Sequence, residues 1–423
     1  MCSFCSPCTQ AESLFMKGFF NVSDIDSVLA LAGTFSSTTH EEIPLSHTLG
    51  RILSGPIASD VNIPGFTRAT MDGYAVRGSD TFGASQGTPA WLQIKGEVAM
   101  GETPTFSLSP GEAAAISTGG MLPEGADAVV MVEHTDRVDE ETVEVYKSVA
   151  PGHHIISTGE DFQKEAPLLS SGVVITPSVT GLLAAAGKTT VSVFKKPVVG
   201  IISTGDEVVD VSEKPTGAQI RDINTHTLSA MVLEGGGIPK ALGIAGDGEG
   251  DLAPMLAEAV ATCDMVLISG GSSVGMRDRT LGAMEEEKGS EILTHGISIS
   301  PGKPTILAKI DGKPVWGLPG HAASAMVVFE VVVRPFLHHL AGTTAPERPK
   351  VSATLSRNIA SAQGRTDFVR VRLSQNGQET VAEPLLGKSG LIRTMVHAHG
   401  LVRIEKEQEG LYGETPVEIS RLP

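Results

Sequence analysis

The chain has 423 residues, of which 41% are hydrophobic, and a formal net charge of −17. This length predicts about two to four domains. The negative charge argues against nucleic acid and anionic membranes as partners, because it repels their phosphates. An anionic small substrate would therefore need local cations, a helix N-terminus or a metal in its binding site. The most apolar stretch, from Ala325 to Leu340, is interrupted by Glu330, Arg334 and Pro335, so we expect no membrane span.

The N-terminal segment is predicted to be a loose arm over residues 1–20. It lacks the basic start and continuous apolar run of a secretory signal, so we expect a cytoplasmic protein. Cys2, Cys5 and Cys8 have the spacing of a metal or iron–sulfur site, but a fourth ligand is not evident nearby, and a disordered leader is the favoured interpretation. Cys263 lies in an apolar segment and is expected to be a small core residue.

Four regions follow the arm along the chain. Apolar spacing predicts a helix from Asp24 to Phe35, capped by Ser23 or Asp24, and a helix-like stretch from Leu168 to Gly187. Between these two helical stretches, and again near the C-terminus, short β-rich runs alternate with Gly/Pro turns. We therefore predict a β-rich domain (60–158), an α/β domain (195–345) and a C-terminal β domain (346–423).

The α/β region repeats the order apolar strand, loop, helix. Strands are predicted at Val198–Ile202, Met265–Ile268 and Val315–Leu318, and helices from Asn224 to Glu234 and from Ala322 onward. Such alternation indicates a doubly wound parallel sheet that is covered on both faces. Ligands bind beyond the carboxyl ends of the strands in such sheets, so the three following loops are candidate sites.

Each loop supports a functional and a structural interpretation. The adjacent carboxylates within Ser203–Glu207 suit Mg²⁺, although Ser, Thr and Asp also cap helices. The glycines and hydroxyls of Ser269–Arg279 could hold an anion or make an ordinary turn. Leu318–His321 precedes a helix of small residues, and Lys303 lies upstream between two prolines, as expected for an anion contact. In the β-rich region, Asp72 and Thr118 lie in turn-like stretches whose spacing does not decide their role.

These stretches closely resemble the molybdopterin molybdenumtransferase family, which is MoeA in bacteria and the C-terminal domain of gephyrin in animals. The matching stretches include 71–77, 203–207, 269–275, 301–304 and 317–320, and they run in order from about residue 24 to the C-terminus. The resemblance implies an α/β multidomain fold. A central doubly wound α/β domain of the molybdopterin-binding type would accompany two β-rich domains and a small α/β connecting domain (21–59 plus 159–194). It also implies a homodimer.

The implied reaction inserts molybdate or tungstate into adenylylated molybdopterin and releases AMP, with Mg²⁺ as the divalent cation. An adenylyltransferase and apo-molybdoenzymes are implied as further partners. The resemblance implies catalytic roles for Asp72, Thr118, Asp161, Glu207, Asp247 and Asp278. The last three of these would hold the metal, and the first three would be contributed across the dimer. The implied substrate-binding residues are Ser203, Thr204, Gly270, Gly271, Ser272, Ser273, Lys303, Pro319, Gly320, Arg365 and Ser389.

The sequence departs from the family pattern where anions would be handled. Ser300 stands where many relatives have lysine, His321 stands where asparagine is usual, and residues 156–158 replace the usual arginines. These changes bear on the choice between molybdate and tungstate, and we expect Arg68 and His321 to compensate for lost charge. Two alternative functions stay open: a related adenylyltransferase, which is normally much smaller, and a carrier or scaffold that binds molybdopterin without turnover.

Overall fold

The structure is a computed structural model that describes residues 22–248, 250–270, 274–388 and 390–423, with the side chains of 274–278 left out. The described residues form two compact units. One combines residues 22–42 and 50–54 with 192–423, and the other combines 43–49 with 55–191. Several predicted residues lie outside the described ones: Cys2, Cys5, Cys8, Gly271, Ser272, Ser273 and Ser389.

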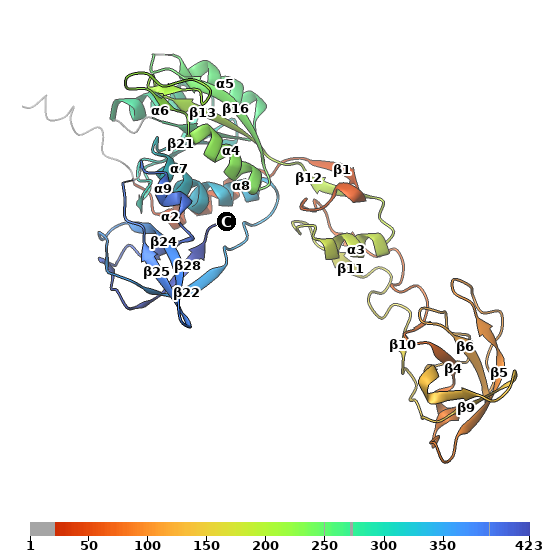
Figure 1. Cartoon of the computed structure of the whole chain (residues 1–423). Helices are drawn as coiled ribbons and strands as arrows, with labels where there is room; N and C mark the ends of the chain where they lie inside the picture. Colours follow the sequence, from red (N-terminus) through yellow and green to blue (C-terminus); the bar gives the residue numbers. More distant parts are fainter. Residues whose placement is uncertain (1–21, 249, 271–273, 389) are drawn as a thin grey trace, which may run out of the picture. The chain divides into compact units, whose positions relative to one another are not determined.

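A six-stranded sheet forms the centre of the first unit (Figure 1). Its order is β16 (Ile238–Ala245), β13 (Val198–Thr204), β17 (Met265–Ser269), β21 (Lys313–Leu318), β20 (Ile306–Ile310) and β18 (Glu291–His295). The first four strands are parallel, whereas β20 and β18 run antiparallel to their neighbours. The three predicted strands, β13, β17 and β21, are therefore parallel as expected, and the two antiparallel strands at one edge were not predicted. There, Asp311 and Gly312 adopt positive φ angles of 50° and 76° and turn β20 directly into β21.

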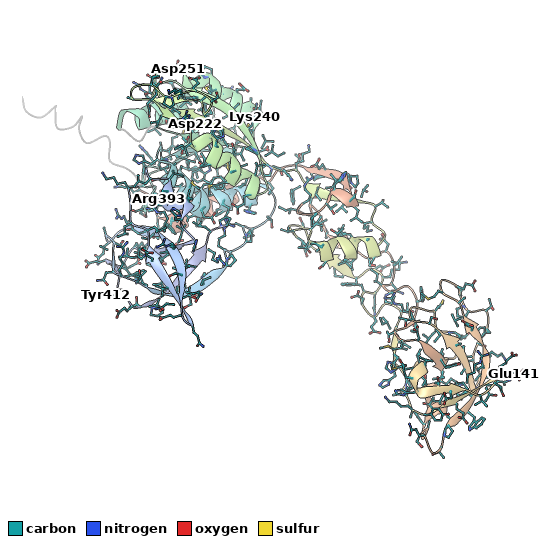
Figure 2. All side chains as sticks on the ribbon, viewed as in Figure 1. Glu141, Asp222, Lys240, Asp251, Arg393 and Tyr412 are labelled. Atoms are coloured by element: carbon teal, nitrogen blue, oxygen red, sulfur yellow. The ribbon has the colours of Figure 1, made fainter. Side chains whose placement is uncertain are left out.

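Helices cover both faces of this sheet, as predicted. Successive strand residues alternate between two cores: Ile201 and Leu267 pack into one, and Ile202 and Ile268 pack into the other. The first core includes residues of α2 (Ile25–Ala30), α4 (Asn224–Glu234), α7 (Ala322–Val328), the π-helix η5 (Phe329–Val333) and α8 (Arg334–Leu340). The second includes residues of α5 (Leu252–Thr262) and α6 (Val274–Glu286). On the edge strand, Lys240 donates hydrogen bonds to Glu258 and Thr262 of α5 (Figure 2).

The continuous helix Ala322–Leu340 is long and apolar enough to cross a membrane, but 67% of its most apolar window is buried inside the protein. The indole of Trp316 meets the ring of Phe336 edge-on, with centroids 4.9 Å apart. The charges that interrupt the apolar run are paired, because Glu330, at 6% exposure, lies 2.7 Å from the Arg348 guanidinium and 3.1 Å from that of Arg334. These contacts are those of a core helix in a globular domain.

The C-terminal part of the first unit is a closed barrel. Its strands pair in the order β24 (Thr366–Asn376), β25 (Glu379–Pro384), β22 (Lys350–Leu355), β28 (Pro416–Arg421) and β26 (Gly400–Ile404), and β26 also pairs with β24. The short strand β19 (Ile299–Ser300) comes from the α/β domain and runs parallel to β24, with Ile299 opposite Thr366 and Ser300 opposite Asp367. This pairing holds the Ser300–Pro304 loop beside the barrel. The exposed ring of Tyr412 follows β27 (Gly410–Leu411) (Figure 2).

The second unit contains a six-stranded sheet with two small cores. The order is β7 (Ala128–Met131), β4 (Gly73–Val76), β6 (Glu112–Ile116), β5 (Ala90–Val98), β9 (Thr142–Val145) and β8 (Thr135–Arg137). Tyr74 and Val76 pack on one face and Ala75 packs on the other. A Cβ at Gly73 would lie 1.9 Å from the Val130 carbonyl oxygen, so this position requires glycine.

Two predicted helices differ from the structure in their bounds. The helix expected over 24–35 is α2 followed by the 3-10 helix η1 (Leu31–Thr34), and the Asp24 carboxylate accepts from the Asp26 backbone N–H as its cap. The helix-like pattern from Leu168 to Gly187 was wrong in its first half. That part forms β11 (Pro167–Leu169) and a turn, and α3 (Pro177–Ala185) begins only after the Thr176 cap.

Candidate active site

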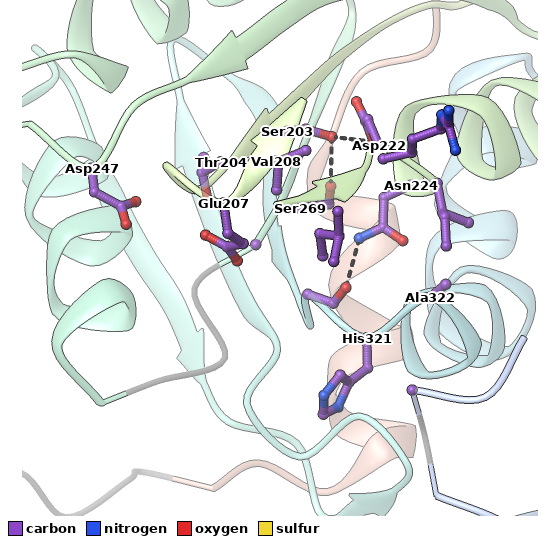
Figure 3. A pocket seen from close by; sticks show the side chains of 16 residues that line it. Ser203, Thr204, Glu207, Val208, Asp222, Asn224, Asp247, Ser269, His321 and Ala322 are labelled. Atoms are coloured by element: carbon purple, nitrogen blue, oxygen red, sulfur yellow. Dashed lines mark hydrogen bonds between the residues drawn. The ribbon is translucent and has the colours of Figure 1, made fainter. Parts of the chain in front are cut away.

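The carboxyl ends of β13, β17 and β21 meet around a cavity of about 380 Å³ (Figure 3). We call it the acidic pocket, because its charged lining residues are Glu207, Asp222 and Asp247 with Arg221 alone opposing them. Six predicted residues line it. Ser203, Thr204, Glu207, Gly270 and Gly320 lie in the strand-end loops, as expected from the strand-end rule, and Asp247 was implied by the family resemblance.

One wall of the acidic pocket is a buried hydrogen-bond network (Figure 3). The Ser203 hydroxyl donates to the Asp222 carboxylate over 2.9 Å, and the Thr225 backbone N–H donates to the same oxygen over 3.0 Å. Ser269 lies 3.3 Å from the Ser203 hydroxyl. Asp222 was missed as a site residue by sequence reasoning, because it lies outside the three strand-end loops. The network fixes this wall before any ligand binds.

Three buried polar atoms in the acidic pocket have no hydrogen-bond partner among the described residues. They are Thr204 Oγ1, Asn224 Oδ1 and Asp247 Oδ1. The Asn224 amide nitrogen, in contrast, donates to the Gly320 carbonyl over 2.9 Å, which fixes the side chain's orientation. Buried polar atoms are normally satisfied, so three unsatisfied atoms around one cavity indicate a ligand site. Asn224, like Asp222, was not predicted.

Glu207 and Asp247 are placed to hold a divalent cation. Figure 3 shows their carboxylates turned toward each other. The Asp206 carboxylate accepts from the Asp247 backbone N–H over 2.7 Å, which ties the two loops together. A Cβ at Gly205 would lie 2.5 Å from Glu207 Oε2, so glycine leaves room for that carboxylate. Two carboxylates suit Mg²⁺ bound with substrate phosphates. The described residues contain no cluster of three metal-ligating side chains, and the predicted third ligand, Asp278, has its side chain outside them.

Gly270 closes the floor of the acidic pocket. Its φ is 145°, and a Cβ there would lie 2.0 Å from the Thr204 hydroxyl oxygen. Glycine is therefore required at position 270, the first glycine of the predicted glycine-rich loop, because the ends of β13 and β17 approach each other closely there.

A second cavity, of about 550 Å³, lies between the α/β domain and the barrel. We call it the basic pocket, because its charged lining residues are Lys303, Arg365 and Arg370 with Asp367. The predicted substrate-binding residues Lys303, Pro319 and Arg365 line this cavity and not the acidic pocket, so the structure divides the predicted site between two cavities. The pairing of β19 with β24 is the cause, since it turns the Lys303 loop toward the barrel.

Arg370 is a basic-pocket residue that sequence reasoning did not assign to the site. It is 7% exposed, and within the described part of the chain its guanidinium donates one hydrogen bond, from Nη2 to the Gly387 carbonyl over 3.4 Å. Nε and Nη1 have no partner among the described residues, and burial lowers the pKa of the guanidinium. Arg365, in contrast, lies 2.8 Å from the Asp367 carboxylate. A buried guanidinium without a carboxylate favours binding of an anion nearby.

The second unit contains the other predicted catalytic residues. The Thr118 backbone N–H and hydroxyl donate to Asp72 Oδ1 over 2.6 Å and 2.9 Å, and these hydrogen bonds lower the pKa of the Asp72 carboxyl. The pair predicted from separate turns is therefore in contact. Asp161 is exposed, and no hydrogen bond or ion pair joins it to Asp72 or Thr118 in the described part of the chain.

Comparison with known proteins assigns the chain to a family. Residues 22–187 match the MoeA N-terminal region (domain I and II), residues 200–339 match a probable molybdopterin binding domain, and residues 352–422 match the MoeA C-terminal region (domain IV). The molybdopterin molybdenumtransferase of Bacillus subtilis is 33% identical over 366 residues, which cover 86% of this chain and 85% of that protein. The chain belongs to the MoeA family.

Other relatives agree with this assignment. A putative molybdopterin biosynthesis protein of Methanocaldococcus jannaschii is 35% identical, over 88% of this chain and 89% of that protein. The crystal structure of a molybdopterin biosynthesis MoeA protein from Pyrococcus horikosii superposes with a TM-score of 0.81 at 38% identity, covering 95% of this chain and 99% of that one. In MoeA terms, the acidic pocket lies mainly in the molybdopterin binding domain, and the basic pocket adds residues of domain IV.

Proposed function

We propose that this MoeA protein is a molybdopterin molybdenumtransferase, which inserts molybdate or tungstate into adenylylated molybdopterin and releases AMP. Relatives that bear the transferase name match most of the chain at about one-third identity. The observation that carries the proposal is the presence of two neighbouring pockets of opposite charge, lined by the residues expected from the family resemblance. One suits a nucleotide with a divalent cation, and the other suits an oxyanion.

In the acidic pocket, Glu207 and Asp247 would hold Mg²⁺ through carboxylate oxygens. The ion would neutralise the phosphoanhydride whose cleavage releases AMP. The chain's own contribution is to bind and orient the substrate. Thr204 and Asn224 have polar atoms that no described residue satisfies and that can hydrogen-bond it, and the Ser203–Asp222 network keeps that wall rigid.

In the basic pocket, Lys303 and Arg370 would bind the oxyanion, with Arg365 as a weaker contact because Asp367 already pairs with it. Guanidinium and ammonium groups donate charge-assisted hydrogen bonds to tetrahedral anions. This binding would offset the repulsion expected from a chain of net charge −17.

Several further assignments belong to the same proposal. We infer that the protein works as a cytoplasmic homodimer and meets an adenylyltransferase and apo-molybdoenzymes as partners. Asp72, Thr118 and Asp161 are proposed catalytic residues of the second unit, and Asp278 is a proposed third metal ligand. Gly271, Ser272, Ser273 and Ser389 are proposed substrate contacts.

The proposal is tested by supplying the purified chain with adenylylated molybdopterin, Mg²⁺ and either molybdate or tungstate, and by timing AMP release. We expect AMP release that requires both the oxyanion and Mg²⁺, with the faster oxyanion identifying the preferred substrate. Tight binding of the pterin without AMP release would instead identify a carrier.

A further inference from the structure

Two further carboxylates lie beside the metal-binding loops without lining the acidic pocket. Asp206 is the second residue beyond β13, and Asp247 is the second residue beyond β16. The two strands pair in parallel up to their last residues, so the two loops leave the sheet side by side. Glu207 and Asp247 line the cavity, whereas Asp206 and Asp251 are exposed and lie outside its lining. We call these four side chains the loop carboxylates.

Asp206 and Asp251 hold the backbone on both sides of Asp247. Asp206 Oδ1 accepts a hydrogen bond from the Asp247 N–H over 2.7 Å. Asp251 Oδ2 accepts one from the Gly248 N–H over 3.1 Å. Hydrogen bonds from backbone N–H groups to carboxylates are charge-assisted and stronger than those between neutral groups. The two peptide groups that flank the Asp247 Cα are therefore both held from outside the cavity, which directs its side chain.

Asp251 is not used as an ordinary helix cap. It immediately precedes α5, where an aspartate side chain normally accepts from the N–H groups of the first turn. Asp251 makes no such hydrogen bond and turns back to the loop instead. A Cβ at Gly246 would lie 2.6 Å from Asp251 Oδ2 and 3.2 Å from Asp206 Oδ1. Both carboxylates therefore converge on the short segment that carries Asp247.

The charge of these loops makes such fixing necessary. The loop carboxylates have no ion-pair partner among the described residues. Arg221, the lining cation of the acidic pocket, donates from Nε to two backbone carbonyls. The carboxylates of Glu249 and Asp278 lie outside the described part of the chain. Mutual repulsion would turn the Asp247 carboxylate away from the pocket, and the two backbone hydrogen bonds oppose that movement.

We propose that Asp206 and Asp251 are positioning residues, which hold the Asp247 backbone so that its carboxylate meets the divalent cation. The inference rests on the proposed function and explains how the metal site of that function keeps its geometry. Neither positioning residue binds the cation itself. Removing a group that orients a metal ligand lowers metal affinity by about tenfold to a hundredfold.

The test measures binding of Mn²⁺, as a probe for Mg²⁺, to the full chain with AMP present, by electron paramagnetic resonance. Asp206→Ala and Asp251→Ala remove the acceptors, so each should weaken Mn²⁺ binding by about tenfold. Asp206→Asn removes the charge but keeps an acceptor oxygen for the Asp247 N–H. It should therefore bind Mn²⁺ within about threefold of the wild type, because an exposed charge that is not a ligand contributes little.

Two reference variants frame these values. Glu207→Gln shows the loss expected for a direct ligand of the cation. Asp139→Ala is the matched control, because Asp139 is an exposed aspartate of the second unit that accepts from the Glu141 backbone N–H over 2.8 Å. It should leave Mn²⁺ binding unchanged.

AMP release gives a second measurement. Asp206→Ala should raise the Mg²⁺ concentration needed for the half-maximal rate, while the rate at saturating Mg²⁺ changes little. A general folding defect would instead lower the rate at every Mg²⁺ concentration. Melting curves that match the wild type exclude misfolding as the cause of a change.

The outcomes distinguish this inference from the proposed function. Unchanged Mn²⁺ affinity in both alanine variants, with affinity lost in Glu207→Gln, overturns the positioning role and leaves the proposed metal site standing. Equal losses in Asp206→Ala and Asp206→Asn would identify Asp206 as a direct ligand and overturn the inference as well. If Glu207→Gln also binds Mn²⁺ like the wild type, the metal site assigned to the acidic pocket fails.

Discussion

The two units of the molecule hold their candidate catalytic carboxylates in different ways. In the second unit, Asp72 accepts two hydrogen bonds from Thr118, and its pKa is lowered by them. In the first unit, the Asp247 carboxylate has one buried oxygen without a partner among the described residues, and it faces Glu207 across the acidic pocket. The first arrangement orients a charged group in advance, whereas the second leaves oxygen atoms ready for a cation.

The same contrast separates the two arginines of β24. Arg365 is paired with Asp367, whereas Arg370 is buried with two nitrogens that find no partner in the described part of the chain. Groups that are already satisfied by the protein lose little when a ligand is absent, while unsatisfied groups gain most when it binds. Replacing a group that lacks hydrogen-bond partners within the described residues should therefore weaken ligand binding more than replacing a group that the protein already satisfies.

The largest effect is expected at the metal-binding carboxylates. Glu207→Gln and Asp247→Asn should each reduce Mg²⁺-dependent AMP release by about a hundredfold or more, because a metal at the reacting phosphate contributes several kcal/mol. The measurement is the rate of AMP release as a function of Mg²⁺. Glu258→Gln, on the exposed surface of α5, is the control. Unchanged Mg²⁺ dependence in either variant would contradict the assignment.

Arg370→Met should weaken molybdate binding by about tenfold to a hundredfold, because charge-assisted hydrogen bonds are lost. Thermal stability should stay the same or rise, since the substitution removes a buried charge that lacks a carboxylate. Calorimetry and thermal melting measure the two effects. Arg372→Met is the control on the same strand, because Arg372 is exposed and paired with Glu383. A lower melting temperature with unchanged binding would show that Arg370 is structural.

Thr118→Val should reduce AMP release by about tenfold, because two hydrogen bonds orient Asp72 and the variant keeps only the backbone one. The pKa of Asp72 should rise toward the usual value of about 3.9, which NMR titration of the carboxyl measures. The lowered pKa stabilises the wild type at neutral pH, and this contribution is lost as pH falls through the acidic range. Thr118→Ser should restore the wild-type pKa, and its failure to do so would argue against the hydroxyl's role.

The smallest effect is expected in the wall of the acidic pocket. Ser203→Ala removes one donor to Asp222 and should lower the free energy of unfolding by about 1 kcal/mol. Chemical denaturation measures it, and Ser212→Ala, which removes an exposed hydrogen bond to Asp210, is the comparison. A larger loss at Ser212 than at Ser203 would reverse the predicted order.

The sequence predicted the parts of the site that local pattern determines. Apolar runs located β13, β17 and β21, and the strand-end rule then assembled Ser203, Glu207 and Gly270 around one cavity. The spacing of Asp72 and Thr118 did not reveal their contact, because an antiparallel pairing between β4 and β6 brings them together. Contacts between distant strands are absent from any periodic pattern.

Asp222, Asn224 and Arg370 were missed for a similar reason, because no local sequence pattern marks them. Asp222 and Asn224 follow the short exposed strand β15 (Ile220–Arg221), which has no apolar run to mark it. Arg370 lies on β24, where a charged residue is expected to face solvent, but both Arg370 and Val371 are buried. The burial of Arg370 depends on the closure of the barrel and the approach of the α/β domain. The division into two pockets likewise follows from the β19–β24 pairing, which links residues more than 60 positions apart.

The β19–β24 pairing also ties the position of the Lys303 loop to that of the barrel. Lys303 follows β19 by three residues and Arg370 lies on β24, so one short stretch of shared backbone hydrogen bonds sets the separation of the two cations. A rotation of the barrel would carry the Lys303 loop with it and would leave the acidic strand ends behind. The distance between Lys303 and the acidic strand ends therefore depends on how the barrel packs against the α/β domain.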